Sequence, residues 1–417
     1  KGVKLNGSVN LNTVGYWADG IEQRRDPFNW FLTGNLNVNL FGYNAPFSFS
    51  YSNADRSFSQ PFNQFSFAPQ YKWVRAYLGY SSMTFSNYTL SGHVFLGAGA
   101  ELTPGKWRIA MMYGRLRKAV SFDLDDTLQY SNASFKRMGY GLKVGYENNG
   151  DAISANIFAA KDDLNSIPFI LPESQLAPQQ NIAVSFSARK KILERIFVEA
   201  EYAVSALNKD MRVSGNETDT VIASTDNLIK NLLPENATNR YFDALNASIG
   251  YQGNWYAIRV RYERVSPEYQ TLGAYYFNND MENITLAPTF RLFNGKLNLA
   301  ANAGLQKNNL DDTRASSTER WVGTVNANYV PNAKWNFAGN YSNFTSYTNI
   351  RPQEDPFFRN SLDTLNFYQL SQTMTGTVIR NLGGKNNPQS IMLNTSYQQA
   401  SDRSTYDGGT QLSDFKS

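Results

Sequence analysis

The stretch Met138-Gly139-Tyr140-Gly141-Leu142-Lys143-Val144-Gly145-Tyr146 decides the fold. Every even-numbered residue in it is large and apolar, and every odd-numbered residue is glycine or lysine. This period of two is typical of a β-strand with one apolar and one polar face. Segments with the same period recur along the whole chain, among them 196–205, 256–263, 297–306 and 391–397. The sequence therefore predicts an all-β protein.

The lengths of the alternating segments point to a membrane. They run for about 9–12 residues, whereas globular strands cluster near five or six and a tilted strand that crosses a bilayer needs ~9–11. Of the 417 residues, 41% are hydrophobic and only 18% are charged. No apolar run approaches the ~20 residues of a membrane-spanning helix, because the apolar residues occupy every second position. We therefore expect a membrane protein built from strands.

Short and long connections between the segments alternate from residue 93 onward. The short ones contain tight-turn formers such as Asn-Gly and Pro-Gly, and they lie at 103–106, 148–151, 252–254, 293–296 and 330–333. The long ones are polar, with 206–240 the longest, and they lie at 117–134, 162–179, 206–240, 266–280, 307–318 and 343–365. This asymmetry is typical of outer-membrane barrels, which have short periplasmic turns and long external loops.

Applied to the whole chain, this parity predicts about 19 strands, within a range of roughly 18–20. The first strands are expected at 4–17, 29–42, 47–53, 63–68 and 71–81, with a turn at Pro69-Gln70 between the last two. The prediction is one domain over residues 1–417, a transmembrane antiparallel up-and-down β-barrel. Because single-chain bacterial barrels have an even number of strands, either a closing strand is absent from this chain or the count is wrong by one.

The composition argues against several kinds of functional site. The chain has no cysteine and one histidine, His93, which leaves little room for a metal cage, thiol catalysis or a hydrolase triad. A net charge of +4 without a basic run does not favour nucleic-acid binding. We expect no enzyme activity, no cofactor, no metal and no nucleic-acid partner.

One local stretch resembles a known family. Tyr71–Tyr80, Leu90–Gly92 and Phe95–Gly99 are similar to the strand, in-folded loop and strand of porins. The whole pattern resembles outer-membrane β-barrel proteins of Gram-negative bacteria, and the abundance of Asn, Tyr and Phe is similar to that of Bacteroidota members. The resemblance implies a multi-pass protein of the bacterial outer membrane in which residues 82–92 bend into the lumen. The candidate constriction residues are Phe85, Asn87, Tyr88 and His93.

The alternation places charged residues on the face opposite the apolar one. A charge facing lipid at the middle of the membrane costs ~2–4 kcal/mol on a barrel, so these residues are expected to line the lumen: Arg75, Arg108, Arg137, Lys143, Arg189, Glu199, Glu201, Arg259, Arg261, Glu263, Arg291 and Arg320. Two interpretations stay open. The cations form a mildly anion-attracting pore wall, or they pair with carboxylates and brace a filled interior.

Two functions agree with this pattern. The leading hypothesis is a porin-like channel for passive diffusion of small polar or anionic solutes, in contact with outer-membrane lipid and lipopolysaccharide. The alternative is a structural or accessory subunit of a larger outer-membrane complex for secretion, nutrient uptake or barrel assembly. Its lumen would be blocked, and its partners would be other outer-membrane proteins or lipoproteins.

Overall fold

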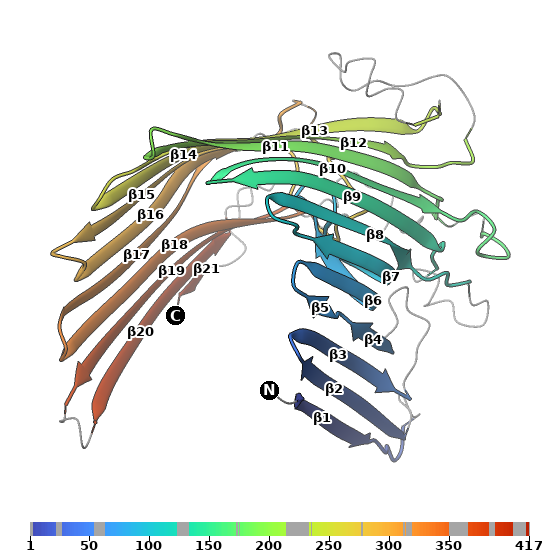
Figure 1. Ribbon diagram of the computed structural model, residues 1–417, viewed down its shortest axis with the longest axis horizontal. Coiled ribbons are helices and arrows are strands. Elements are labelled where there is room, and N and C mark those ends of the chain that lie inside the picture. The colour runs from blue at the N-terminus through green and yellow to red at the C-terminus, as the bar shows by residue number, and fades with distance from the viewer. Residues whose placement is uncertain are drawn as a thin grey trace. The chain divides into compact units, whose positions relative to one another are not determined.

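The structure is a computed structural model that describes residues 3–21, 27–53, 63–122, 133–171, 174, 176–213, 233–234, 236–276, 278–311, 313, 319–349, 366–382, 388–402 and 414–416. The regular elements in these ranges are β-strands, labelled in Figure 1. Within the same ranges, no helix is long and apolar enough to cross a membrane.

The chain forms two compact units. Unit 1 comprises Lys1–Lys190, Ala200–Leu245 and Val265–Asp280, and unit 2 comprises Lys191–Glu199, Asn246–Arg264 and Met281–Ser417. Four long strands contribute residues to both units: β11 (Gln180–Ile192), β12 (Ile196–Asn208), β13 (Asn239–Gln252) and β14 (Tyr256–Val265).

In unit 1, successive strands pair in antiparallel fashion along the chain. The pair β9–β10, for example, stays in register from Asn148↔Asp151 to Arg137↔Asp162. The strands before β11 are β1 (Lys4–Gly15), β2 (Phe28–Leu40), β3 (Tyr43–Ser52), β4 (Gln64–Phe67), β5 (Gln70–Tyr71), β6 (Val74–Thr84), β7 (Ser91–Leu102), β8 (Trp107–Arg117), β9 (Arg137–Asn148) and β10 (Asp151–Asp162).

Unit 2 continues the same antiparallel order. Each strand from β15 to β20 pairs with the next along the chain, and a short β21 pairs with the end of β20. These strands are β15 (Met281–Leu292), β16 (Leu297–Lys307), β17 (Glu319–Asn332), β18 (Trp335–Asn349), β19 (Asn366–Asn381), β20 (Ser390–Asp402) and β21 (Asp414–Lys416).

The turn predicted at Pro69-Gln70 is wrong. β4 and β5 both pair with β3 on one side and with β6 on the other, so they are two pieces of one strand. Pro69 interrupts this strand because proline has no N–H to donate to the ladder. The chain reverses instead at Lys72 and Trp73, where Lys72 adopts a φ of 51°.

The alternation of connection lengths is confirmed by the strand boundaries. From β7 onward, tight turns such as the one between β9 and β10 alternate with long connections such as the one between β12 and β13 (Figure 1). Two predicted loops are too long. β18 continues to Asn349, so the loop expected from residue 343 begins later, and both ends of the loop expected at 206–240 belong to β12 and β13. The three residues of β21 add a strand segment that the sequence pattern did not reveal.

Most long strands present one exposed apolar face. In β9 the side chains of Tyr140, Leu142 and Val144 are exposed, while Gly139 and Gly141, which flank Tyr140, are buried. The same holds in unit 2, where the exposed apolar residues include Ile284, Leu305, Val325, Tyr341, Ile391 and Leu393. A folded protein in water would bury such continuous apolar bands, whereas lipid covers them in a membrane.

Strand length and aromatic placement agree with this assignment. Apart from β4, β5 and β21, the strands are 10–16 residues long, enough for a tilted strand to cross a bilayer. Trp107, Trp255 and Trp335 lie at tight turns. Trp107 makes an edge contact with the Tyr146 ring, Trp255 makes a tilted contact with the Tyr256 ring, and Trp335 stacks on Phe337, as expected of an aromatic belt at the membrane interface. The described residues thus have the all-β, antiparallel, up-and-down strand arrangement that the sequence predicts, with strands long enough to cross a bilayer.

Candidate functional site

The connection between β6 and β7 differs from the other connections on the predicted external side. β6 runs to Thr84 and β7 starts at Ser91, so only residues 85–90 form a turn, which we call the hairpin tip. Five of its residues are buried, including Tyr88 at 2% exposure and Leu90 at 0%, and only Asn87 is exposed. Residues 82–84 and 91–92 of the predicted loop 82–92 therefore belong to β6 and β7, and the remaining six residues form a short tip packed inside unit 1.

The hairpin tip packs on the polar faces of β9 and β12. Lys143 Nζ donates a hydrogen bond to the carbonyl oxygen of Phe85 at 2.7 Å. The Ser86 hydroxyl donates to the carboxylate of Glu201. Gly141 lets the Phe85 ring approach closely, since a Cβ at that position would lie 2.7 Å from the ring. The structure thus brings together three residues that the sequence placed separately: Phe85, Lys143 and Glu201.

A second segment covers the other side of the hairpin tip. This segment, which we call the strap, is the connection between β14 and β15, residues 266–280. Tyr269 Oη donates to the carbonyl oxygen of Tyr88 at 2.7 Å, and Thr271 Oγ1 donates to that of Thr89 at 2.9 Å. The backbone N–H of Ser91 donates to the carbonyl oxygen of Gly273 at 2.9 Å.

The strap is itself anchored to the sheet by buried polar groups. Asn181 Oδ1 on β11 accepts from the backbone N–H of Leu272 at 3.0 Å, and its Nδ2 donates to Ser205 Oγ on β12 at 2.8 Å. The Ser205 hydroxyl in turn donates to the carbonyl oxygen of Gln270 at 2.7 Å. Satisfied buried networks of this kind fix one conformation, because each unmade hydrogen bond would cost free energy.

His93 lies beside the strap rather than at the hairpin tip. Its ring stacks on that of Tyr275 at 4.1 Å between centroids, and the Tyr275 hydroxyl accepts from the backbone N–H of Val94 at 3.2 Å. His93 Nδ1 lies 2.8 Å from the carbonyl oxygen of Val94. This residue therefore braces the start of β7 against the strap.

We expect Tyr269→Phe to loosen the hairpin tip. The change leaves the buried carbonyl of Tyr88 without its donor, which costs about 1–3 kcal/mol in the free energy of unfolding. Burial raises the pKa of the Tyr269 hydroxyl, so the bond's contribution is full below pH ~10 and is lost as the pH rises further. Denaturant unfolding in lipid vesicles at neutral pH measures the difference.

Tyr276→Phe is the matched control for that change. Tyr276 lies in the same strap but is 94% exposed. Removal of its hydroxyl should leave the free energy of unfolding unchanged. Equal effects of the two variants would contradict the role assigned to Tyr269.

The predicted lumen cations are mostly engaged by neighbouring groups in the described residues. In unit 1, Arg108 pairs with Glu147 at 3.2 Å and Arg137 pairs with Asp162 at 2.7 Å. The guanidinium of Arg75 lies over the Tyr77 ring. Arg189 is exposed in β11. These residues lie on different strands and do not form a single cluster.

In unit 2, charged residues of β14 lie close together. Arg261 pairs with Glu263 at 3.1 Å and donates to Asn246 Oδ1 at 2.9 Å. Arg259 lies over the Phe197 ring at 4.8 Å. Glu199 is half-buried in β12. Arg320 belongs to β17, but its side chain lies outside the described residues.

A buried network at the end of β10 includes a cation that sequence reasoning missed. Asp162, whose side chain has no exposed surface, accepts from Arg137 Nε at 2.7 Å and Nη2 at 2.8 Å. Arg117 Nη2 lies 3.4 Å from the same carboxylate, and the backbone N–H of Gln179 donates to it at 2.9 Å. These contacts join β8, β9 and β10 where the long connections begin.

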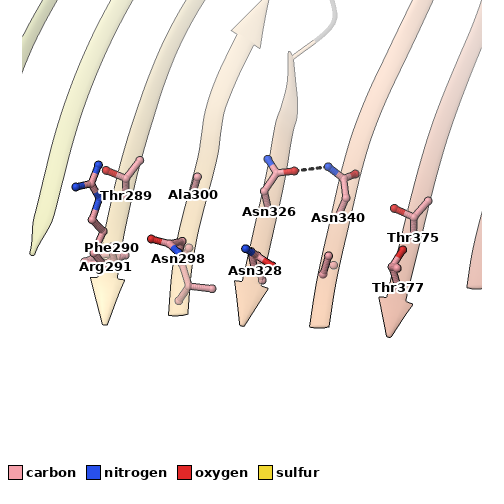
Figure 2. Close-up of a pocket in the computed structure, with 14 residues that line it drawn as sticks. Thr289, Phe290, Arg291, Asn298, Ala300, Asn326, Asn328, Asn340, Thr375 and Thr377 are labelled. Atoms are coloured by element: carbon pink, nitrogen blue, oxygen red, sulfur yellow. Dashed lines mark hydrogen bonds between the residues drawn. The ribbon is translucent and has the colours of Figure 1, made fainter. Parts of the chain in front are cut away.

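A polar groove on β15–β19 is the second candidate site (Figure 2). It has a volume of about 530 Å³ and lies within unit 2. Its polar side chains come from neighbouring strands and lie on one face of the sheet: Thr289, Arg291, Asn298, Asn326, Asn328, Asn340, Thr375 and Thr377. Only Arg291 among them was a predicted site residue. Asparagines at alternate positions, as in 326 and 328, are the signal that could have revealed the others.

Comparison with known proteins finds similarity in structure only. No protein-family model matches the chain, and no curated protein matches its sequence. The solved structures that are similar include two proteins of Pseudomonas aeruginosa, OccK8 (OprE) and the outer membrane protein OprD. OccK8 (OprE) is 9% identical with a TM-score of 0.41, covering 95% of this chain and 97% of that one. OprD is 8% identical with a TM-score of 0.39, covering 95% and 93%. A Rh. blastica porin mutant is 10% identical with a TM-score of 0.31, covering 77% and 98%.

Proposed function

We propose that this protein is a porin-like channel that lets small polar or anionic solutes diffuse passively across the outer membrane. One observation carries the proposal. Strands long enough to cross a bilayer expose apolar side chains on one face and carry Asn, Thr and Arg side chains on the other. In a barrel whose outer face meets lipid, the polar face lines the interior. A polar interior gives dissolved solutes a path through the apolar layer.

The hairpin tip is the proposed constriction of this channel. It packs on the polar faces of β9 and β12, on the side away from the exposed apolar band. A segment held there takes up space inside the barrel and narrows the passage. Phe85 and Tyr88 are then packing residues of the constriction, whereas Asn87 is exposed to the solute.

Single-channel recording in planar bilayers tests the proposed function. The folded protein should produce discrete current steps whose size grows with salt concentration. Protein that is folded and inserted, as shown by its resistance to protease, but that carries no current would contradict a channel function.

Charge selectivity tests the role of the basic residues. We expect Arg259→Gln with Arg261→Gln to reduce any preference for anions, measured as the reversal potential in a salt gradient. The shift should be small, because Arg261 is already paired with Glu263 at 3.1 Å. Arg380→Gln is the control, since Arg380 lies over the Trp335 ring rather than on the polar face. A larger shift from the control than from the double variant would refute a basic pore wall.

The alternative function, a blocked accessory barrel, also has a specific observation in its favour. The hairpin tip is almost completely buried, and several cations on the polar faces pair with carboxylates. Such an interior would brace the barrel instead of passing solutes. Stable partners that co-purify in mild detergent, together with absent conductance, would favour this function over the channel.

A further inference from the structure

We infer that the groove in unit 2 binds neutral, hydroxyl-rich solutes, of which short saccharides are the chemical class. This inference rests on the proposed function and names the solutes that the channel would favour. The groove's binding surface, which we call the asparagine stripe, consists of Asn298, Asn326, Asn328, Asn340, Thr375 and Thr377.

The strand register makes the asparagine stripe continuous. Asn298 is opposite Asn328 across β16 and β17, and Asn326 is opposite Asn340 across β17 and β18. Asn340 is in turn opposite Thr375 on β19. Neighbouring strands are ~4.8 Å apart, and residues two apart on one strand are ~6.8 Å apart. The stripe is therefore a set of polar groups at regular spacings, with Ala300 and Ala338 at the positions opposite Asn326 and Asn328 (Figure 2).

The side chains of the stripe keep hydrogen-bonding capacity for a solute. Asn340 donates to Asn326 along the stripe, and Thr377 donates to Asn394 Oδ1 at 2.9 Å. A carboxamide can donate two hydrogen bonds and accept two more, so these bonds use only part of what is present. Asn298, Asn326 and Asn328 are exposed to the groove.

Backbone preference does not explain so many asparagines in strands. Asparagine is depleted in β-strands, whereas threonine is favoured there and is also polar. For a polar strand face that contacts only water, threonine and serine would serve as well as asparagine and would favour the strand more. The repeated amide therefore supplies something that a hydroxyl does not, which is two donors beside a strong acceptor.

The groove is nearly uncharged, which favours neutral hydroxyl groups over simple anions as its main ligands. Among the residues that line it, Arg291 is the only charged one, and it lies at the β15 edge. A sugar hydroxyl both donates and accepts, as the carboxamides do, so a saccharide can bond to several positions of the stripe at once. A simple anion would find one guanidinium and a row of groups that give it no opposite charge.

Two measurements on the full chain test this inference. Saturation-transfer NMR in detergent micelles measures maltotriose binding directly, and block of the single-channel current by maltotriose measures it in the open pore. We expect Asn326→Val with Asn340→Val to weaken both by about tenfold, since several hydrogen bonds are lost. Valine is a good strand former, so the variant should fold. Asn10→Val with Asn35→Val, two exposed asparagines of β1 and β2 outside the groove, should bind like the parent.

The possible results separate the inference from the proposed function. Maltotriose binding without any current would overturn the channel and leave the stripe standing. Current without maltotriose binding, or equal block by a polyethylene glycol of the same size, would overturn saccharide binding by the stripe. Either result would leave the channel function supported. Binding that is unchanged in the Asn326 and Asn340 double variant would also overturn the stripe.

Discussion

Replacement of the hairpin tip, residues 85–90, by the two-residue turn Asn-Gly is expected to raise the single-channel conductance several-fold. Thr84 is paired with Ser91, so a tight turn can join β6 to β7 directly. The change removes the side chains that pack on β9 and β12 and the carbonyls that bind the strap. Because a narrow point limits the current through the whole pore, widening it has the largest effect of any change in the chain.

Asn87→Ala is the matched control for the shortened hairpin. Asn87 is the exposed residue of the tip, and its truncation should leave the tip in place and change the conductance far less than replacement of the whole tip. An unaltered conductance after replacement of the entire tip would show that the tip does not restrict the path. Noisy current with the same mean would show that another segment sets the width.

Asp162→Ala is expected to have the largest effect on stability. Removal of this carboxylate leaves the buried guanidinium of Arg137 without its charged partner, with Arg117 nearby. Breaking a buried pair in this way costs about 3–5 kcal/mol. The free energy of unfolding, measured with guanidinium on protein folded into lipid vesicles, should fall by that amount.

The neighbouring Asp163 provides the control for that measurement. It is exposed, and its carboxylate accepts one hydrogen bond, from the backbone N–H of Asn165 at 3.1 Å. Asp163→Ala should therefore change the free energy of unfolding by well under 1 kcal/mol. If both variants lost the same stability, the network around Asp162 would not be the cause.

The strand pattern was predictable because it is a local property. The alternation in residues 138–146 specifies which side chains meet lipid, and Asn-Gly or Pro-Gly pairs specify the tight turns. The error at Pro69-Gln70 has a physical reason of the same kind. Proline marks both turns and strand interruptions, and only pairing with β3 and β6 shows which one is present.

The candidate sites were only partly predictable because their partners are distant in sequence. Lys143 and Phe85 were both candidates, but nothing local joins a lysine of one strand to a carbonyl 58 residues away. Tyr269 and Thr271 lie in what reads as an ordinary polar loop, and Asn181 in an ordinary strand. The asparagine stripe was hidden for another reason, since each asparagine alone is a common residue on a wetted face.

The contacts between the hairpin tip and the strap have a consequence for the order of folding. Tyr269 and Thr271 reach carbonyls that precede them by 181 and 182 residues. The β6–β7 hairpin can form early from local contacts, yet its tip has no donors for these carbonyls until the segment after β14 is in place. Closing so long a loop is slow, so the locking of the tip belongs among the late steps of assembly. An intermediate with the hairpin formed and the tip still mobile should then precede the native state.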